Sequence, residues 1–206
     1  MDELERWKDS PIWDAEPTQH KYFYPVSIDP KEALAEGTRL AVGNPPDETY
    51  RFGPFVCASS PQSHYGPWRN AIDFLVPDGT AVVAALNGVI VEVQELSNEW
   101  GPTQEYANTL NYITIGHEGN EYTQYCHLAQ WSVQEQKLAR GDKVERGQRI
   151  GTVGKTGWTD RDHLHFIAFR NIELAGPSPF PAGAKGFKSL KVRFKHPWLQ
   201  RLAARH

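Results

Sequence analysis

Two histidines lie two positions apart in the stretch DHLHF, at positions 163 and 165. Side chains alternate between the faces of a β-strand, so His163 and His165 share one face and the apolar residues that alternate with them face the core. The two imidazoles then stand about 7 Å apart on one surface. Neutral imidazole is the commonest metal ligand in proteins, and a catalytic zinc usually keeps three protein ligands and one open position. The stretch therefore predicts part of a metal centre.

Further polar residues in apolar or loop settings are candidates for the same centre. Asp73 lies within the apolar run AIDFLV, where a carboxylate is costly to bury unless a cation or hydrogen-bond donors receive it. His64 lies nine residues earlier, in a loop with Gly and Pro that leads into this run. His127 ends the run EYTQYCHL, and Tyr125 precedes it by two residues on the same predicted strand face. We expect these segments to meet at one site.

Each of these residues also has an ordinary structural interpretation. A single histidine in a strand is more often a polar residue with satisfied hydrogen bonds than a metal ligand. Asp73 alone is compatible with the cap of a turn or with an ion pair to Arg69. A structural protein with an accidental histidine cluster is thus one alternative. The combination of residues, each in a strand or at a strand edge, favours a shared site.

The order of these residues carries a family resemblance. The order His, Asp, Tyr-x-His-Leu and His-x-His, with the intervening DGTAVVAALNGVIVEV and GDKVERGQRIGTVGKTG, resembles the lysostaphin-like, or LytM-type, zinc endopeptidases. The resemblance covers residues 60–170, about half of the chain, and fills every metal and catalytic position of the family pattern. It implies one bound Zn²⁺ with the ligands His64, Asp73 and His165. It also implies that His127 and His163 are the catalytic pair.

The resemblance implies a metallo-endopeptidase that hydrolyses peptide cross-links or stem peptides of bacterial peptidoglycan. In such a reaction zinc activates water, while protein groups accept its proton, stabilise the oxyanion and protonate the leaving amine. We assign the proton acceptor and the donor to His127 and His163, without deciding which residue has which role. Aromatic residues that flank the site are candidates for a substrate groove. They are Tyr65, Trp68, Tyr125 and Trp158.

Two features depart from the family pattern. His64 and Asp73 are often closer together in the family, although the loop HYGPWRNAID resembles a known longer variant. Cys126 occupies a position that is commonly small and apolar, and we expect its thiol to serve packing rather than redox sensing. Cys57 and Cys126 permit one disulfide, but two separate buried thiols are favoured because free cysteine behaves as a small hydrophobic residue.

Two other functions remain alternatives. A LytM-type cell-wall binding or amidase-regulating module keeps the fold but does not cut peptides, and such modules usually lack one or more metal ligands. A zinc hydrolase of another substrate class, such as a small-peptide hydrolase, is the second. The complete ligand set favours the peptidoglycan endopeptidase over the regulatory module.

Short apolar runs separated by turn residues must position these side chains. The runs are rich in β-branched residues, which predicts an antiparallel β domain. They are AIDFLV, AVVAAL, GVIVEV, NYITIG, EYTQYCHL, RIGTVG, HLHFIAF and LKVRF. We predict a mainly β protein with a single antiparallel β-sheet domain of the lysostaphin-like (duplicated hybrid motif) architecture at residues 56–195. An irregular N-terminal arm at residues 1–55 wraps this domain, and a C-terminal tail follows at residues 196–206.

Composition limits the partners of the chain. Its 206 residues are enough for one well-buried domain, and 22 Lys and Arg balance 25 Asp and Glu without a basic stripe, so nucleic acid is not an expected partner. No stretch approaches the roughly 20 apolar residues that span a bilayer. No secretion signal is visible at the start of the chain. Because the implied substrate lies outside the cytoplasm, we expect a periplasmic or secreted protein. The sequence carries no signal for oligomeric state.

Overall fold

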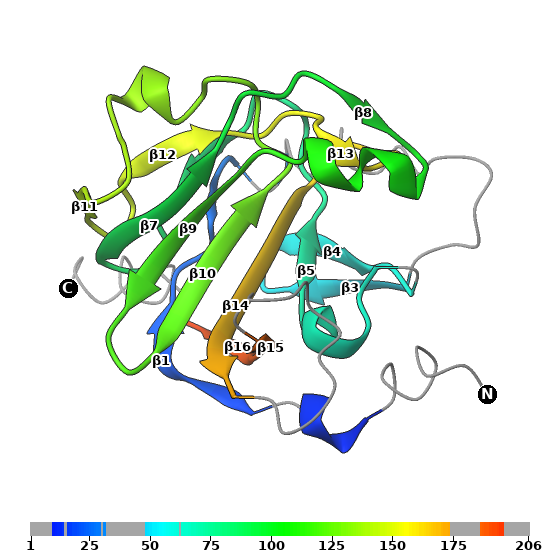
Figure 1. Cartoon of the computed structure of the whole chain (residues 1–206), viewed down its shortest axis with the longest axis vertical. Helices are drawn as coiled ribbons and strands as arrows, with labels where there is room; N and C mark the ends of the chain where they lie inside the picture. The colour runs from blue at the N-terminus through cyan, green and yellow to red at the C-terminus, as the bar shows by residue number, and fades with distance from the viewer. Residues whose placement is uncertain are drawn as a thin grey trace.

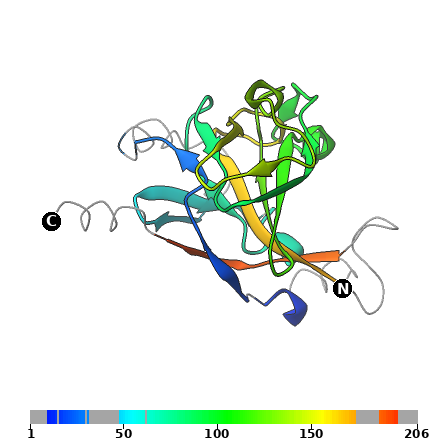
Figure 2. The same ribbon diagram turned by 90° about the vertical axis from the view of Figure 1, so that its left-hand side faces the viewer.

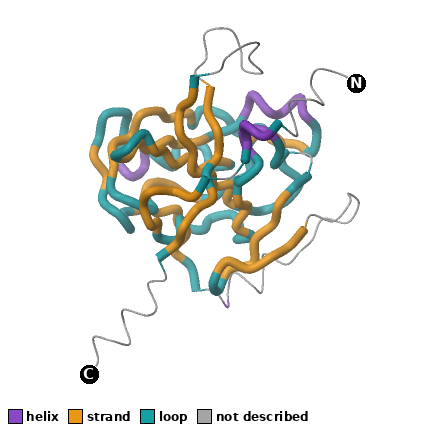
Figure 3. Tube along the Cα trace, turned by 90° about the horizontal axis from the view of Figure 1, so that it is seen from below, coloured by secondary structure: helices purple, strands orange, loops and turns teal. Residues whose placement is uncertain are grey.

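The computed structural model describes residues 10–14, 16–29, 31, 48–61, 63–173 and 186–195. Strands dominate these residues, and the helical turns are short (Figure 1, Figure 3). The predicted mainly β fold is therefore confirmed. No helix in this part of the chain has the length and apolar character needed to span a bilayer. The predicted tail at residues 196–206 lies outside the described residues.

A nine-stranded sheet, antiparallel at every pairing, forms the body of the molecule. Its strands in spatial order are β11 (Lys143–Val144), β7 (Gly88–Gln94), β9 (Tyr112–His117), β10 (Glu121–Cys126), β14 (Leu164–Ile172), β5 (Ile72–Phe74), β4 (Phe55–Ser59) and β3 (Glu48–Phe52), with β15 (Gly186–Ser189) also paired to β14. This sheet contains most of the runs that the sequence pattern predicts as strands.

Smaller elements surround this sheet and depart from the predicted single sheet. A three-stranded antiparallel sheet contains β12 (Arg149–Thr152), β6 (Ala81–Val83) and β2 (Val26–Ser27). Two parallel pairs join β1 (Pro17–Tyr22) to β16 (Lys191–Phe194) and β8 (Trp100–Gly101) to β13 (Gly157–Trp158). The 3₁₀ helices are η1 (Pro11–Trp13), η2 (Gly66–Trp68), η3 (Gln104–Thr109) and η4 (Gln134–Gln136).

The hydrophobic core lies on one face of the large sheet, between it and the β12-β6-β2 sheet. Side chains from both sheets and from β1 and β16 belong to one buried cluster. Its members include Phe74, Ile113, Tyr125 and Phe166 from the large sheet, Val26, Val82 and Ile150 from the small sheet, and Tyr22 and Val192 from the β1-β16 pair. The opposite face of β5, β14 and β10 is consequently available for polar groups.

Asp73, His165 and Cys126 form a row across three neighbouring strands on that opposite face. Backbone pairing places Asp73 of β5 opposite His165 of β14, and His165 opposite Cys126 of β10. Directly opposed residues of antiparallel strands share a face, so their side chains are neighbours. The sequence neighbours of Asp73 and His165 are buried in the core, as the alternating pattern predicts. Strand register alone therefore brings together residues that are far apart in the sequence.

The described part of residues 1–55 is more regular than the predicted irregular arm. It contains β1, β2 and β3, and β1 runs beside β16 along the base of the molecule in Figure 2. The carboxylate of Glu121, which is fully buried, accepts hydrogen bonds from the backbone N–H groups of Gln19 and His20 and from the Tyr22 hydroxyl. These strands are too short to produce a visible period in the sequence, and their regularity comes from pairing with distant strands.

Glu121→Ala should loosen the N-terminal strand. The variant leaves buried donors without an acceptor, which costs about 1–3 kcal/mol of the free energy of unfolding. We expect faster amide hydrogen exchange over residues 17–22 by mass spectrometry, whereas Glu118→Ala, a change at an exposed neighbour, should leave it unaltered. Unchanged exchange in the Glu121 variant would show that this carboxylate does not hold the strand.

Candidate metal centre

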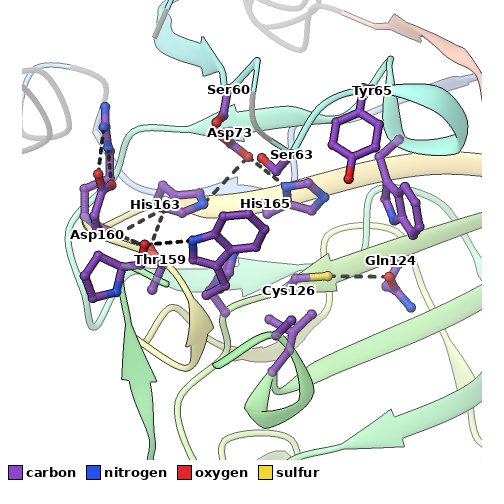
Figure 4. A pocket seen from close by; sticks show the side chains of 17 residues that line it. Ser60, Ser63, Tyr65, Asp73, Gln124, Cys126, Thr159, Asp160, His163 and His165 are labelled. Carbon is purple, nitrogen blue, oxygen red and sulfur yellow. Dashed lines mark hydrogen bonds and ion pairs between the residues drawn. The ribbon is translucent and has the colours of Figure 1, made fainter. Parts of the chain in front are cut away.

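The three predicted metal ligands lie close together. His165 Nδ1 lies 2.9 Å from Asp73 Oδ1, and His64 Nε2 lies 3.2 Å from Asp73 Oδ2. His64 Nε2 and His165 Nδ1 are 3.3 Å apart. One potential ligand atom from each residue lies within 4.8 Å of the other two. Figure 4 shows Asp73 joined by dashed lines to both His163 and His165.

The predicted catalytic pair lies beside this group. His127, His163 and His165 form a second set whose nitrogen atoms lie within 4.8 Å of one another. The ring centroids of His127 and His163 are 4.5 Å apart, and His163 Nε2 is 3.7 Å from Asp73 Oδ1. His165 belongs to both sets, so all five residues surround one small volume.

His64 reaches this volume from the loop that follows β4. Its backbone N–H donates to Ser60 O at 2.7 Å, and Gly66 adopts a positive φ of 53° as the loop turns into η2. The hydroxyl of Ser59 lies 3.3 Å from His64 Nδ1. That contact directs the other ring nitrogen, Nε2, towards Asp73 and His165. The longer spacing between His64 and Asp73 is thus taken up by a loop that folds back on the strand.

The backbone at His127 departs from strand geometry. β10 ends at Cys126, and His127 has a φ of 62°, a left-handed conformation that is rare for a residue with a side chain. The N–H of Gly154 donates to His127 O at 2.8 Å. A Cβ atom at Gly154 would lie 2.5 Å from the backbone of Ala129, so only glycine permits this approach. The imidazole Nδ1 lies 2.7 Å from Thr156 O and must therefore carry the proton of this hydrogen bond.

Tyr125 does not line the groove, which corrects the prediction from the sequence. It is fully buried in the core, where its hydroxyl accepts hydrogen bonds from the Ala85 N–H at 2.9 Å and from the Thr123 hydroxyl at 3.1 Å. Burial raises the pKa of Tyr125 to about 12. The prediction assumed that the strand alternation continued to His127, whereas the left-handed residue turns His127 to the other face.

The electrostatics of the site favour an ionised Asp73 carboxylate and uncharged rings at His127 and His165. Burial by itself raises the pKa of Asp73, but the attraction of His64 and His163 and hydrogen bonds from His165 and His64 outweigh it and hold this pKa well below its usual value. Burial lowers the pKa of His127, and the neighbouring histidines lower it further. Burial also lowers the pKa of His165, against the opposing effect of Asp73. These protonation states are those in which carboxylate and imidazole bind metal ions.

The donor set fits a divalent cation such as zinc. Two imidazoles and one carboxylate are a common set of zinc ligands, and the burial of Asp73 gives the structure a carboxylate that a cation would neutralise. Burial raises the pKa of the nearby Cys126 thiol, whose Sγ lies 3.5 Å from Gln124 Oε1, so the thiol keeps its proton. Neither Cys57 nor Cys126 forms a disulfide, as the sequence favoured.

A groove of about 430 Å³ opens beside these residues. Asp73, His127, His163 and His165 lie on its surface. Three of the aromatic residues predicted to line a groove do so, namely Tyr65, Trp68 and Trp158. The sequence interpretation missed other lining residues from η3, from β10 and from the loop before His163. They include Ala107 of η3, Pro102 and Leu110 on either side of it, Gln124 of β10, and Thr159, Asp160 and Arg161 of the loop.

The missed residues of the groove have different sequence signals. Trp158 Nε1 donates to Pro102 O at 3.0 Å, and β13 pairs with β8, so the segment around η3 forms a wall opposite η2. Nothing periodic in the sequence marks that segment. Asp160 and Arg161 lie in the loop GKTGWTDRD, which the sequence favours for the groove because it directly precedes His163.

The chain matches peptidase family M23 over residues 68–175, more than half of its length. It belongs to this family. His64 lies just before the matched residues. The other four histidine and aspartate residues of the site lie within them.

Curated relatives of this M23 chain are longer proteins. It is 36% identical over 98 residues to the peptidoglycan DD-endopeptidase ShyA of Vibrio cholerae, a match that covers 48% of this chain and 19% of ShyA. It is 33% identical over 135 residues to lysostaphin of Staphylococcus simulans, covering 64% of this chain and 24% of lysostaphin. It is 31% identical over 135 residues to the glycyl-glycine endopeptidase ALE-1 of Staphylococcus capitis, covering 64% of this chain and 32% of that enzyme.

A solved structure described as a zinc-containing peptidase from Vibrio cholerae is also similar to this M23 chain. It is 26% identical, with a TM-score of 0.43, and the match covers 72% of this chain and 36% of the other.

Ser59→Ala should weaken metal binding by this M23 chain. The variant removes the hydroxyl beside His64 Nδ1, and loss of a hydrogen bond behind a metal ligand typically costs about 10-fold to 100-fold in affinity. We expect a weaker affinity for Zn²⁺ in competition with a chromophoric chelator. Ser59→Thr keeps the hydroxyl and should retain most of the affinity. Equal affinities in the Ala variant and the unchanged chain would exclude this role for Ser59.

The metal-free M23 chain should lose stability on mild acidification. In the folded chain the pKa values of His127 and His165 lie below the ordinary 6.5, so the unfolded chain takes up protons on these residues first as the pH falls. The contribution of these two uncharged rings to the free energy of unfolding is therefore fully present above the pKa that they have in the unfolded chain. It decreases as the pH falls towards their pKa values in the folded chain. We expect a falling Tm between about pH 7 and about pH 5, with a shallower fall for His127→Ala. A Tm difference between the two that does not change with pH would contradict the burial of a neutral His127.

Proposed function

We propose that this chain is a zinc metallo-endopeptidase that hydrolyses peptide cross-links or stem peptides of bacterial peptidoglycan. The observation that carries the proposal is that two sets of potential ligand nitrogens and oxygens share His165 at the edge of one groove. Membership of peptidase family M23 supports the reaction type. The names of the relatives, peptidoglycan DD-endopeptidase and glycyl-glycine endopeptidase, support the substrate class.

His64, Asp73 and His165 are the proposed ligands of one Zn²⁺ ion. Their geometry supports this assignment, because His64 and His165 both direct a ring nitrogen at the Asp73 carboxylate. Two neutral imidazoles and one carboxylate leave a divalent cation with net positive charge, and zinc in such a site polarises a carbonyl and makes water acidic enough to act as a nucleophile near neutral pH. The ring of His64 is buried behind the groove, while His165 and Asp73 lie on its surface.

His127 is the proposed acceptor of the proton from the attacking water. Its Nδ1 donates to Thr156 O, so Nε2 keeps an unshared electron pair, and a ring nitrogen of His127 lies within 4.8 Å of nitrogens of His163 and His165. The lowered pKa of His127 keeps the ring neutral and able to accept a proton. A neutral ring whose Nδ1 donates a short hydrogen bond to an uncharged carbonyl can accept a proton on Nε2.

His163 is the proposed donor that protonates the leaving amine. Its Nδ1 lies 3.1 Å from Arg161 O, a carbonyl that can only accept, so this nitrogen carries a proton and Nε2 faces the site. Nε2 lies 3.7 Å from Asp73 Oδ1, so it faces the proposed metal ligands. In this scheme His163 takes up and delivers a proton during the reaction.

The walls of the groove support an extended peptide as substrate. Tyr65 and Trp68 lie on one side, and Trp158, Pro102 and Leu110 line it from other elements. The site is at the surface of the groove rather than in a closed cavity, so a chain can pass through it. Because peptidoglycan lies outside the cytoplasm, we propose that the chain acts in the periplasm or after secretion.

Purified peptidoglycan supplies the test of this function. We expect the zinc-loaded chain to release new amino termini, and a chelator to abolish the release. His127→Ala and His163→Ala should lower the rate by about 10²-fold or more while one Zn²⁺ stays bound, because general acid–base groups contribute about 10²–10⁴-fold. His20→Ala, at a histidine outside the site, is the matched control.

Specific results would contradict the proposal. Near-normal turnover by either alanine variant would refute its assigned role. Zinc binding and peptidoglycan binding without release of amino termini would identify a non-catalytic wall-binding module. Turnover of short peptides without preference for muropeptides would identify a different substrate class. Mass spectrometry of products from glycine-bridged and directly cross-linked muropeptides would identify the bond that is cut.

A further inference from the structure

Asn111 is a fully buried polar residue outside the site, and all of its hydrogen-bonding groups are used. Its side-chain Nδ2 donates to Ser97 O at 2.9 Å and to Leu128 O at 3.3 Å, and its Oδ1 accepts from the Ser97 N–H at 3.0 Å. Its backbone O accepts from the Leu128 N–H at 3.2 Å. Asn111 therefore holds both polar backbone groups of Leu128, the residue that follows His127.

Thr156 links the same residues to the next loop. Its hydroxyl donates to Leu128 O at 3.0 Å and accepts from the Asn111 N–H at 3.1 Å. Its backbone carbonyl accepts the proton of His127 Nδ1 at 2.7 Å. The side chain of Thr156 thus fixes the position of the carbonyl that orients the imidazole.

The contacts of Asn111 and Thr156 take the place of the strand hydrogen bonds that are missing beyond the end of β10. β10 ends at Cys126, and the left-handed φ of His127 removes it from the strand ladder. A backbone in that conformation persists only where its surroundings determine it. Asn111 provides one donor pair and one acceptor on a short side chain, a combination that an apolar residue or a carboxylate does not offer.

We propose that Asn111 and Thr156 are positioning residues that hold His127 with a proton on Nδ1 and an unprotonated Nε2 facing the site. This inference rests on the proposed function, because it assigns the two residues to the proton acceptor of that reaction. Neither residue lines the groove. Their effect on the reaction is exerted through His127.

Thr156→Val tests the proposal, because valine keeps the shape of threonine and replaces its hydroxyl with a methyl group. We expect kcat on a purified cross-linked muropeptide dimer to fall about 10-fold or more, with KM within about 2-fold and zinc content unchanged, since small misplacements of a catalytic group have large effects on rate. Thr156→Ser restores the hydroxyl and should recover most of the lost kcat.

Thr123→Val is the matched control for a loss of stability. Thr123 is also buried, and its hydroxyl contacts His117 Nε2 at 2.9 Å and the Tyr125 hydroxyl at 3.1 Å on the core side of β10. This variant should lower Tm to a similar degree and leave kcat unchanged. If Thr123→Val lowers kcat as much as Thr156→Val, the effect is one of stability and the proposal is overturned.

A second measurement does not depend on activity. Imidazole ¹⁵N chemical shifts of the zinc-loaded chain, with His127 assigned by comparison with His127→Ala, distinguish the protonated nitrogen from the unprotonated one. We expect a single Nδ1–H form in the unchanged chain and in Thr156→Ser, and a mixture of forms in Thr156→Val. A single Nδ1–H form in Thr156→Val overturns the proposal. If the unchanged chain cleaves no muropeptide, the proposed function fails, but these shifts still decide the positioning role.

Discussion

The burial of one carboxylate organises this protein. Asp73 lies in the interior of a large antiparallel sheet, where an ionised group is unfavourable unless positive charge or hydrogen-bond donors surround it. His64, His163 and His165 provide those contacts at 3.2, 3.7 and 2.9 Å. The same contacts place imidazole nitrogens around the carboxylate oxygens. The burial of this carboxylate and the assembly of the proposed metal site therefore depend on the same side chains.

The five residues of the site are held by two kinds of structure. Asp73 and His165 occupy opposed positions in paired strands, so the ladder of backbone hydrogen bonds fixes their separation. His64, His127 and His163 lie outside the strands, where individual hydrogen bonds with Ser59, Gly154, Thr156 and Arg161 hold them in place. Strand positions tolerate changes in nearby side chains, whereas loop positions depend on individual hydroxyl, carbonyl and glycine contacts. The loop residues of the site are consequently supported by more hydrogen bonds from side chains and loop backbone than the strand residues are.

The groove combines this rigid floor with walls from separate segments. The floor belongs to the face of β5, β14 and β10 that is turned away from the core. The walls come from η2 on one side and from the β8, η3 and β13 region on the other. The proposed metal ligands and the walls of the groove thus belong to different elements of the fold.

The sequence by itself determined the strands and most of the site. Alternation in HLHFIAF and the single acidic residue in AIDFLV placed His165 and Asp73, because period-2 burial is a local property of a strand, whereas His163 immediately precedes β14. The mainly β fold followed from the same runs. The pairing of strands in the N-terminal segment, the direction of Tyr125 and the wall around η3 were decided only by tertiary structure. Each depends on a contact with a residue far away in the chain or on a single left-handed residue, and neither leaves a periodic pattern in the sequence.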